Sequence, residues 1–418
     1  MQTRMVTDWN MRRIAWLGLI IAAGLLARAE AIRYLRWDEI QPVFASFAAA
    51  GIRAPSFSDE AEFDGWIRQR DADVRSRIDR GLEDSISTLA LTGSSFTPLP
   101  KIQNTGDAVN AAGDLTPAAR SRVQAFVQAI DEQDQDRLTM VREFLRRQRV
   151  PDEEVRAFII GSLRRFALEQ AGFQRKHAQG PPRMDGGISG ETSLLAGFSV
   201  EDSLAYLKSK GAMPARIHRI AVIGPGLDFA GAAGDAFPPQ SFQPFAILDS
   251  VLRLGIAQPV DVEVTSFDLN PSVLMHLKTL PPKLRGGRYV LRLPGQAVTG
   301  WNAGANAYWQ HFGESIGKPV KPQFAARILA EELDIVTQTR ETPAFDLVVA
   351  TNVFGYYNVL EQAMAMTNIA QMLASGGIVL VNNPLQTDKV QSLEYLGTRR
   401  VVFTDNGAGD DVLMFRRR

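Results

Sequence analysis

Cysteine is absent from this chain of 418 residues, and histidine is scarce, with four residues in total. The missing thiols exclude disulfides, thiolate metal sites and cysteine nucleophiles, and they leave the redox compartment undetermined. The histidines show no ligand-like spacing, so we expect no metal site. An excess of positive charge is also lacking, because 46 basic residues balance 46 acidic ones. This balance removes the electrostatic footprint of a nucleic-acid-binding protein, and we expect no nucleic acid partner.

Long hydrophobic runs are lacking except near the N-terminus, where Arg12 and Arg13 precede the uncharged run IAWLGLIIAAGLL. This run covers residues 14–26, and the segments ARA and AEA after it resemble small-residue cleavage sites. It is shorter than the roughly 20 apolar residues of a full membrane span. The layout predicts a signal peptide or a membrane anchor over residues 1–31, and therefore an exported or membrane-associated protein. The alternative is a buried first helix in a cytoplasmic protein.

The chain does have the length and the apolar content, 45% hydrophobic residues, for a sizeable core and two domains. Residues 32–180 predict a helical N-terminal domain, because segments such as VPDEEVRAFIIGSLRRFALEQAGF repeat apolar residues at steps of three and four. Residues 181–198 continue a Gly/Pro/Ser-rich stretch that is either an interdomain linker or a loop closing over a site. In the next segment, SVEDSLAYLKSKG, Ser199 is predicted to cap a helix.

Residues 199–418 alternate strand patterns with helix patterns. The segments RIAVIG, DVEVTSF, FDLVVATN and GIVLVNNP predict buried strands, and the helical segments between them imply a parallel sheet. RRVVFTD and DDVLMFRR, joined by NGAG, predict a terminal antiparallel hairpin. The predicted fold is α/β, a Rossmann-like doubly wound sheet with a C-terminal antiparallel hairpin, preceded by a mostly α-helical N-terminal domain.

The segment AVIGPGLDFAG places Gly224 and Gly226 directly after the first of these strands. Such a turn brings the backbone close to a nucleotide-like ligand. A nicotinamide dinucleotide site expects a third glycine, and an acid about twenty residues further on. Here Phe229 holds the position of the third glycine, and Asp268, which ends the second strand, lies much further along. Both departures argue against a nicotinamide cofactor.

A parallel α/β sheet with a terminal hairpin and these motifs resembles the class I S-adenosylmethionine-dependent methyltransferases, over roughly residues 199–418. The resemblance implies that S-adenosylmethionine is the cofactor. It also implies that Gly224, Pro225 and Gly226 approach the methionine part of the cofactor. Asp268, followed by Leu269, matches the acid that accepts both ribose hydroxyls in this family, since two carboxylate oxygens suit two neighbouring donors.

Further positions follow from the same resemblance. Glu332 or Asp334, in AEELDIV, lies where the family places a polar residue near the adenine. Asn352 and Tyr356, after the strand FDLVVA, correspond to the loop at the methyl-transfer centre, and we predict them as catalytic residues, with Asn352 also contacting the cofactor. NVFGYYNVLEQ is locally similar to the chemotaxis-receptor carboxyl methyltransferases, in which Gln362 also has a matching position.

Two departures from the family leave alternatives open. Val222 stands where most members carry an acid, and Asp228 is the candidate to supply a carboxylate contact to the cofactor instead. The aminopropyltransferases share this fold and an apolar residue at that position, so an enzyme of that type is one alternative. A second alternative is an exported or anchored binding protein without turnover. The chain also resembles a group of bacterial proteins with a leader, a helical region and a methyltransferase-like domain.

The predicted reaction is an in-line displacement of a methyl group, for which the protein mainly supplies proximity and alignment. A general base is needed only for a protonated acceptor, and Tyr356, Asp228 and His311 are the candidates. The acceptor, a small molecule or a protein side chain, is not identified by the sequence. The sequence does not determine the oligomeric state either.

Overall fold

A computed structural model describes residues 31–176 and 187–418, apart from 111, 191, 193–194, 229–238, 292–299, 343, 384 and 386–389. The leader-like run at residues 14–26 and Phe229 lie outside the described residues. Within these described ranges, no helix combines the length and apolar character needed to cross a membrane. The predicted leader and its consequence for location stay predictions.

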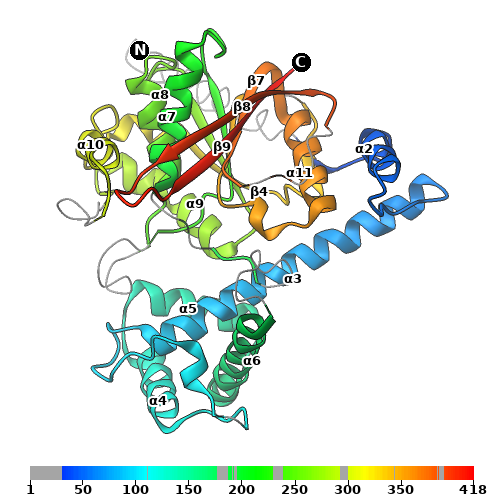
Figure 1. Cartoon of the computed structure of the whole chain (residues 1–418). Helices are drawn as coiled ribbons and strands as arrows, with labels where there is room; N and C mark the ends of the chain where they lie inside the picture. The colour runs from blue at the N-terminus through cyan, green and yellow to red at the C-terminus, as the bar shows by residue number, and fades with distance from the viewer. Residues whose placement is uncertain are drawn as a thin grey trace, which may run out of the picture.

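The first elements of the described part of the chain are mostly helical (Figure 1). In order, they are β1 (Ile32–Tyr34), α2 (Trp37–Ala49), α3 (Glu60–Thr92), the 3-10 helix η1 (Thr105–Ala108), α4 (Pro117–Glu132), α5 (Asp136–Arg147), the 3-10 helix η2 (Asp152–Glu154) and α6 (Val155–Lys176). Local signals place several of these boundaries. The Thr116 side chain, for example, accepts a hydrogen bond from the Ala119 N–H at the start of α4, and Pro117 takes the first helical position.

Strands and helices alternate in the remainder of the chain. They are α7 (Leu195–Ser209), β2 (Arg219–Ile223), α8 (Gln243–Arg253), β3 (Glu263–Asp268), α9 (Pro271–Arg285), α10 (Ala303–His311), the 3-10 helix η3 (Pro322–Ala326), β4 (Ile328–Glu332), β5 (Gln338–Arg340), β6 (Phe345–Ala350), the 3-10 helix η4 (Phe354–Tyr356), α11 (Val359–Met372), β7 (Leu373–Val381), β8 (Leu393–Val402) and β9 (Gly409–Arg417).

The main sheet, within the described residues, has seven strands in the order β4-β3-β2-β6-β7-β9-β8. Strands β4, β3, β2, β6 and β7 pair in parallel, while β9 runs antiparallel to both β7 and β8. The predicted fold class is therefore confirmed, including the terminal hairpin. The chain order reverses between β2 and β6, and open α/β sheets bind ligands beyond the carboxyl ends of the strands at such a switch point.

Helices cover both faces of the sheet, and alternate residues of β2 show how the two sides are filled. Ile220 and Val222 pack into a core with α7, α8, α9 and α10, while Ala221 and Ile223 face a core with α2, α11 and the first half of α3. The aromatic segment of α10, with Tyr308 and Trp309, belongs to the first of these cores.

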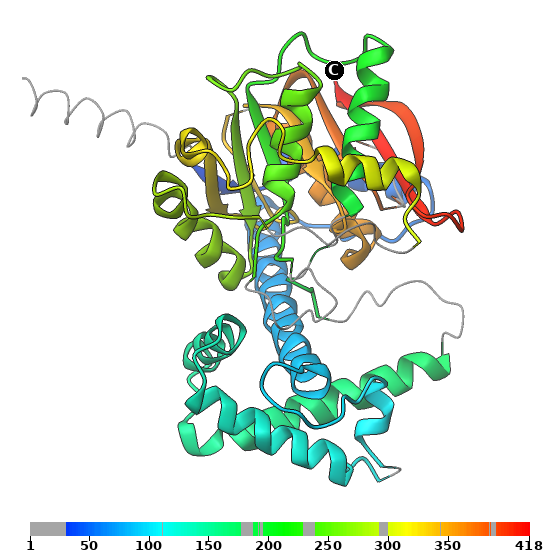
Figure 2. The same ribbon diagram turned by 90° about the vertical axis from the view of Figure 1, so that its left-hand side faces the viewer.

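The helix α3 connects two parts of the molecule. Its first half packs in the core against the sheet, and its second half packs with α4, α5 and α6 in a third core. Figure 2 shows α3 running from the α/β part into this helical bundle. On the N-terminal side of α3, strand β1 pairs with β5. The first described strand is therefore hydrogen-bonded to the α/β part. The described part of the predicted N-terminal domain therefore contributes to two different cores, a distribution that the sequence pattern did not reveal.

The start of α7 corrects one local prediction. The helix begins at Leu195, so Ser199 lies inside it and is not its cap. The Ser199 hydroxyl is buried and donates a hydrogen bond to Asp410 at 2.9 Å. By contrast, Asn270 caps α9, with its side chain accepting a hydrogen bond from the Ser272 N–H and Pro271 in the first turn.

Candidate functional site

A cavity lies at the carboxyl ends of the parallel strands, at the switch point of the sheet. The space between its lining residues, including the part open to solvent, is about 580 Å³. Six of the predicted site residues line it together: Gly224, Gly226, Asp268, Leu269, Asn352 and Tyr356. The other lining residues are Ile78, Ile188, Ser189, Thr192, Ile223, Phe267, Leu333, Ile335, Val353 and Tyr357. We call this space the strand-end cavity.

The turn after β2 requires glycine at both positions of its motif. Gly224 and Gly226 have φ angles of 60° and 61°, in the left-handed region that favours glycine. A Cβ atom on Gly224 would lie 2.8 Å from Cγ2 of Val353, and one on Gly226 would lie 3.1 Å from the carbonyl oxygen of Gly190. Because the two glycines have no side chains, this turn packs closely against the segments of Val353 and Gly190. The backbone of the turn therefore forms part of the cavity wall.

Gly226→Ala is expected to lower the free energy of unfolding by about 2 kcal/mol, since a left-handed alanine and the contact with the Gly190 carbonyl each contribute about 1 kcal/mol. Gly287→Ala is the matched control, because Gly287 has a φ of 63° and no atom within 4 Å of its built Cβ. Chemical denaturation of both variants measures the difference. Equal destabilisation of the two would show that the close approach contributes nothing.

Asp268 ends β3 and is one of the residues that line the strand-end cavity. One of its oxygens accepts a hydrogen bond from the Asn270 N–H at 2.7 Å. Burial raises the pKa of this carboxyl to about 6, although the backbone N–H groups of Asn270, Gly226 and Leu269 partly offset that effect by stabilising the ionised form. The site thus holds a buried carboxylate whose backbone partners orient it at the end of the strand.

Asn352 follows β6 and has a φ of 61°, which is uncommon for a residue with a side chain. Its backbone N–H donates to Oδ1 of Asn382 at 2.7 Å, and its own Oδ1 accepts from Nδ2 of Asn382 at 2.9 Å. This reciprocal pair holds Asn352 in the left-handed conformation. Strained backbone of this kind clusters at functional sites, where the surrounding structure keeps it in place.

The loop with Tyr356 and Tyr357 is held by Arg77, which comes from α3. The guanidinium donates to the Tyr356 carbonyl at 3.1 Å and to the Glu361 carboxylate at 3.0 Å. Burial raises the pKa of the Tyr357 phenol well above its usual value. Gln362, the third residue of the local similarity, donates to the carbonyls of Phe354 and Tyr357 and so secures the same loop.

Ile188, Ser189 and Thr192 also line the strand-end cavity. The sequence analysis interpreted their segment as a linker or a loop closing over a site and singled out none of the three residues. The Ile188 N–H donates to the Arg77 carbonyl at 2.9 Å, and the Thr192 N–H donates to the Leu227 carbonyl at 3.0 Å. Gly81 of α3 allows the approach, because a Cβ there would lie 1.9 Å from the Ile188 carbonyl oxygen. Thr192 Oγ1 is buried, and no described group forms a hydrogen bond with it.

Three predicted cofactor contacts are not among the residues that line the cavity. Asp334 is fully buried in its own turn, where its carboxylate accepts from Thr337 Oγ1 at 2.7 Å and from the Val336 N–H at 3.0 Å. Its neighbours Leu333 and Ile335 line the cavity instead. Asp228 pairs with Gln240 through backbone and side chain. Pro225 is buried between the two glycines.

Other candidates from the sequence lie elsewhere. Val222 is fully buried in the core with α7 and α8. Glu332, the alternative to Asp334, is half-exposed and pairs with Arg75 at 2.5 Å. His311 is exposed on α10, pairs with Glu314 and does not line the cavity. The sequence offered three candidates for a general base: Tyr356, Asp228 and His311. Of these, Tyr356 alone is among the described residues that line the cavity.

The chain matches no family model and no curated protein sequence. Among solved structures, a TehB-like S-adenosylmethionine-dependent methyltransferase from Corynebacterium glutamicum is 14% identical, with a TM-score of 0.30, over 60% of this chain and 97% of that chain. The N-methyltransferase NodS from Bradyrhizobium japonicum, in complex with S-adenosylhomocysteine, is also 14% identical, with a TM-score of 0.28, over 53% of this chain and 87% of its own. Magnesium protoporphyrin IX methyltransferase from Synechocystis, with bound S-adenosylmethionine, is 10% identical, with a TM-score of 0.27, over 59% of this chain and 91% of that one.

Proposed function

We propose that this protein is an S-adenosylmethionine-dependent methyltransferase and that the strand-end cavity holds the cofactor. The observation that carries the proposal is the convergence of three features on one cavity. Two left-handed glycines, a buried carboxylate and a strained asparagine lie at the ends of the neighbouring strands β2, β3 and β6. They come from motifs far apart in the sequence, and the cavity places them together.

The residues present suit the parts of this cofactor. Asp268 would accept the ribose hydroxyls, and the apolar side chains of Leu269, Leu333 and Ile335 offer a surface for the adenine. The backbone at Gly224 and Gly226 would approach the methionine part. Thr192 Oγ1, buried with no hydrogen bond to a described group, is a further polar atom that a ligand would satisfy.

The cofactor supplies a methyl group on a sulfonium, which is already activated for displacement. The protein's own contribution is to align the two reactants and exclude water. Asn352, held by Asn382, and Tyr356, held by Arg77, are the polar residues proposed at the transfer centre. If the acceptor is protonated, the group proposed to take the proton is the Tyr356 side chain in its deprotonated, phenolate form. The acceptor is a small molecule or a protein side chain.

Isothermal titration calorimetry on the full chain tests the proposal. S-adenosylmethionine and S-adenosylhomocysteine are expected to bind, while NAD is expected not to bind. Tighter binding of decarboxylated S-adenosylmethionine would instead support an aminopropyltransferase. Binding without methyl transfer to any cell-extract fraction, followed with a methyl-labelled cofactor, would support the non-catalytic alternative. Absence of binding at millimolar S-adenosylmethionine, with the fold intact by circular dichroism, would overturn the proposal.

Binding of S-adenosylmethionine is expected to weaken as the pH falls below about 6, by up to about tenfold per pH unit. The reason is that the Asp268 pKa is about 6 and the ionised carboxylate accepts hydroxyl hydrogen bonds. Because the folded-state pKa lies above the ordinary value of 3.8, this group stabilises the fold as the pH falls towards 4. Asp334, whose pKa burial raises to about 7, acts in the same direction.

Calorimetry between pH 5 and pH 8, with a thermal unfolding curve at each pH, separates binding from unfolding. An affinity that stays constant across this range would contradict the assignment of Asp268 to the ribose.

A further inference from the structure

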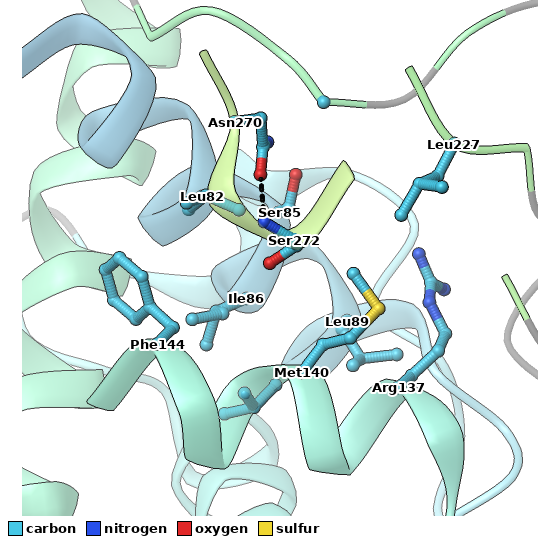
Figure 3. Close-up of a pocket in the computed structure, with 12 residues that line it drawn as sticks. Leu82, Ser85, Ile86, Leu89, Arg137, Met140, Phe144, Leu227, Asn270 and Ser272 are labelled. Carbon is cyan, nitrogen blue, oxygen red and sulfur yellow. Dashed lines mark hydrogen bonds between the residues drawn. The ribbon is translucent and has the colours of Figure 1, made fainter. Parts of the chain in front are cut away.

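The side-chain amide of Asn382, which follows β7, has a defined orientation. It meets the backbone N–H of Asn352 at 2.7 Å, and because an N–H can only donate, the atom that faces it must be Oδ1. Asn270 is oriented in the same way, since its Oδ1 atom accepts from the Ser272 N–H (Figure 3). The other end of the Asn382 amide is therefore Nδ2, which can only donate.

The orientation of Asn382 also fixes the amide of Asn352. Nδ2 of Asn382 donates to Oδ1 of Asn352 at 2.9 Å. The same Nδ2 atom lies 3.4 Å from a carboxylate oxygen of Asp410, which also accepts from the Ser199 hydroxyl at 2.9 Å. Because its oxygen is bound to Asn382, the Asn352 amide keeps its Nδ2 end, which has two N–H donors and forms no hydrogen bond with a described group. A ligand beside Asn352 therefore meets donors and no acceptor.

Asn352 lies at the part of the strand-end cavity where the glycine turn is expected to approach the methionine part of the cofactor. Its neighbour Val353 packs against this turn, because a Cβ on Gly224 would lie 2.8 Å from Cγ2 of Val353. Thr192 packs against the same turn, and its Cβ lies 3.0 Å from the position of a Cβ on Gly226. The polar side chains at this end are thus uncharged.

The methionine part of the cofactor carries two charged groups. Its carboxylate accepts hydrogen bonds, while its ammonium only donates them. The Nδ2 end of Asn352 matches the carboxylate and offers nothing to the ammonium. Val222, at the position where the resemblance expects an acid, is buried in the core. Asp268, the one carboxylate among the described lining residues, is assigned to the ribose.

We propose that Asn352 recognises the carboxylate of the cofactor through its side-chain N–H donors, and that Asn382 is the positioning residue that fixes this polarity. The inference rests on the proposed function, because it requires S-adenosylmethionine to lie in the strand-end cavity. A site of this polarity prefers a nucleoside with an intact amino-acid end over a decarboxylated one. It therefore disfavours the substrate of an aminopropyltransferase.

Calorimetry on the full chain tests this preference with three nucleosides. S-adenosylhomocysteine has both charged groups, its decarboxylated analogue keeps only the amine, and 5′-methylthioadenosine has neither. The wild-type chain is expected to bind S-adenosylhomocysteine at least about tenfold more tightly than the decarboxylated analogue. Asn352→Asp replaces the donor end by an acceptor and keeps the bond from Asn382, so it is expected to abolish this preference and to leave the affinity for 5′-methylthioadenosine unchanged.

Asn358→Asp is the matched control for the added charge. Asn358 caps α11 by accepting from backbone N–H groups, as an aspartate also does, and it does not line the cavity. The preference for S-adenosylhomocysteine is expected to persist in this variant. A wild-type chain without the preference, or a preference that persists in Asn352→Asp, would overturn the proposal.

The role of Asn382 is tested with Asn382→Asp. The new carboxylate still accepts from the Asn352 N–H but cannot donate, so the Asn352 amide must turn its Nδ2 end towards it. The preference for S-adenosylhomocysteine is then expected to fall at least about tenfold, while 5′-methylthioadenosine binds as before. Equal weakening of all three nucleosides would show a merely structural role and would overturn the positioning.

Thermal unfolding tests the orientation of the amide pair without any ligand. Asn352→Asp keeps an oxygen that accepts from Asn382, so its midpoint is expected within about 2 °C of the wild type. Asn382→Asp loses the donor and sets a second carboxylate beside Asp410, so a decrease of at least about 5 °C is expected. The reverse order would overturn the proposal. Absence of binding by all three nucleosides would overturn the proposed function and the carboxylate assignment, while the order of the midpoints would still decide the orientation of Asn352.

Discussion

Asp268→Ala is expected to weaken binding of S-adenosylmethionine by at least about 100-fold and to leave the protein folded. Two hydroxyl hydrogen bonds to a buried carboxylate contribute about 3 kcal/mol together, and 1.4 kcal/mol corresponds to a factor of ten. The fold tolerates the change, because burial raises the pKa of this carboxyl and so disfavours its ionised form in the folded protein. Calorimetry measures the affinity, and thermal unfolding measures the stability.

Two further variants sharpen this test. Asp268→Asn keeps the shape and one acceptor oxygen but removes the charge, so its affinity is expected to lie between the wild-type and alanine values. Glu332→Gln is the matched control, because Glu332 ends the neighbouring strand β4, pairs in register with Asp268 and does not line the cavity. Equal binding by Asp268→Ala and the wild-type chain would remove Asp268 from the cofactor site.

Arg77→Met is expected to lower the free energy of unfolding by about 3 kcal/mol and to weaken cofactor binding about tenfold. The side chains of Arg77 and Glu361 are only 15% and 8% exposed, and removing one partner leaves a buried charge uncompensated. The substitution also removes the hydrogen bond from the Arg77 guanidinium to the Tyr356 carbonyl, and with it this contact between α3 and the loop that lines the cavity. Denaturant unfolding and calorimetry measure the two effects.

The double variant Arg77→Met/Glu361→Gln is expected to recover part of the stability, because no charge is then left unpaired, but not the affinity. Arg400→Met is the matched control, since Arg400 pairs with Asp411 at the surface, where both side chains are about half exposed, and such a pair contributes at most about 1 kcal/mol. A stability loss as large in Arg400→Met as in Arg77→Met would show that burial of the pair is not the cause. Full affinity in folded Arg77→Met would show that α3 does not position the loop.

The sequence predicted the sheet and the centre of the strand-end cavity because both depend on local patterns. Each buried strand is recognisable from its own apolar run, and parallel strands joined by helices bring their carboxyl ends to one edge. Residues at or near the ends of those strands, Gly224, Asp268 and Asn352, were assigned to one site by the resemblance to the methyltransferases, and the structure places them in one cavity. Glycine at a left-handed position is likewise a local requirement that the motif itself expresses.

Residues away from strand ends could not be assigned in this way. The acid at position 334 matched a family position in the sequence, but the structure uses its carboxylate within a turn and presents Leu333 and Ile335 to the cavity. A polar residue in a short loop can bond to its own backbone or point outward, and spacing does not distinguish the two. Ser199 shows the same difficulty, since the helix extends one turn further back and buries the hydroxyl against Asp410.

The sequence by itself determined the alternation of strands and helices and the two glycines, because each follows from periodicity or backbone conformation within a few residues. The choice of Asp268 as the acid of the site came from the resemblance to the methyltransferases. Only the tertiary structure decided that α3 spans two cores, that Arg77 holds the Tyr356 loop and that Ile188, Ser189 and Thr192 line the strand-end cavity. Some of these contacts join positions more than a hundred residues apart, as Arg77 and Tyr356 do. They arise because buried apolar surface and close backbone approach at Gly81 and Gly226 select one packing arrangement, and no local pattern carries that information.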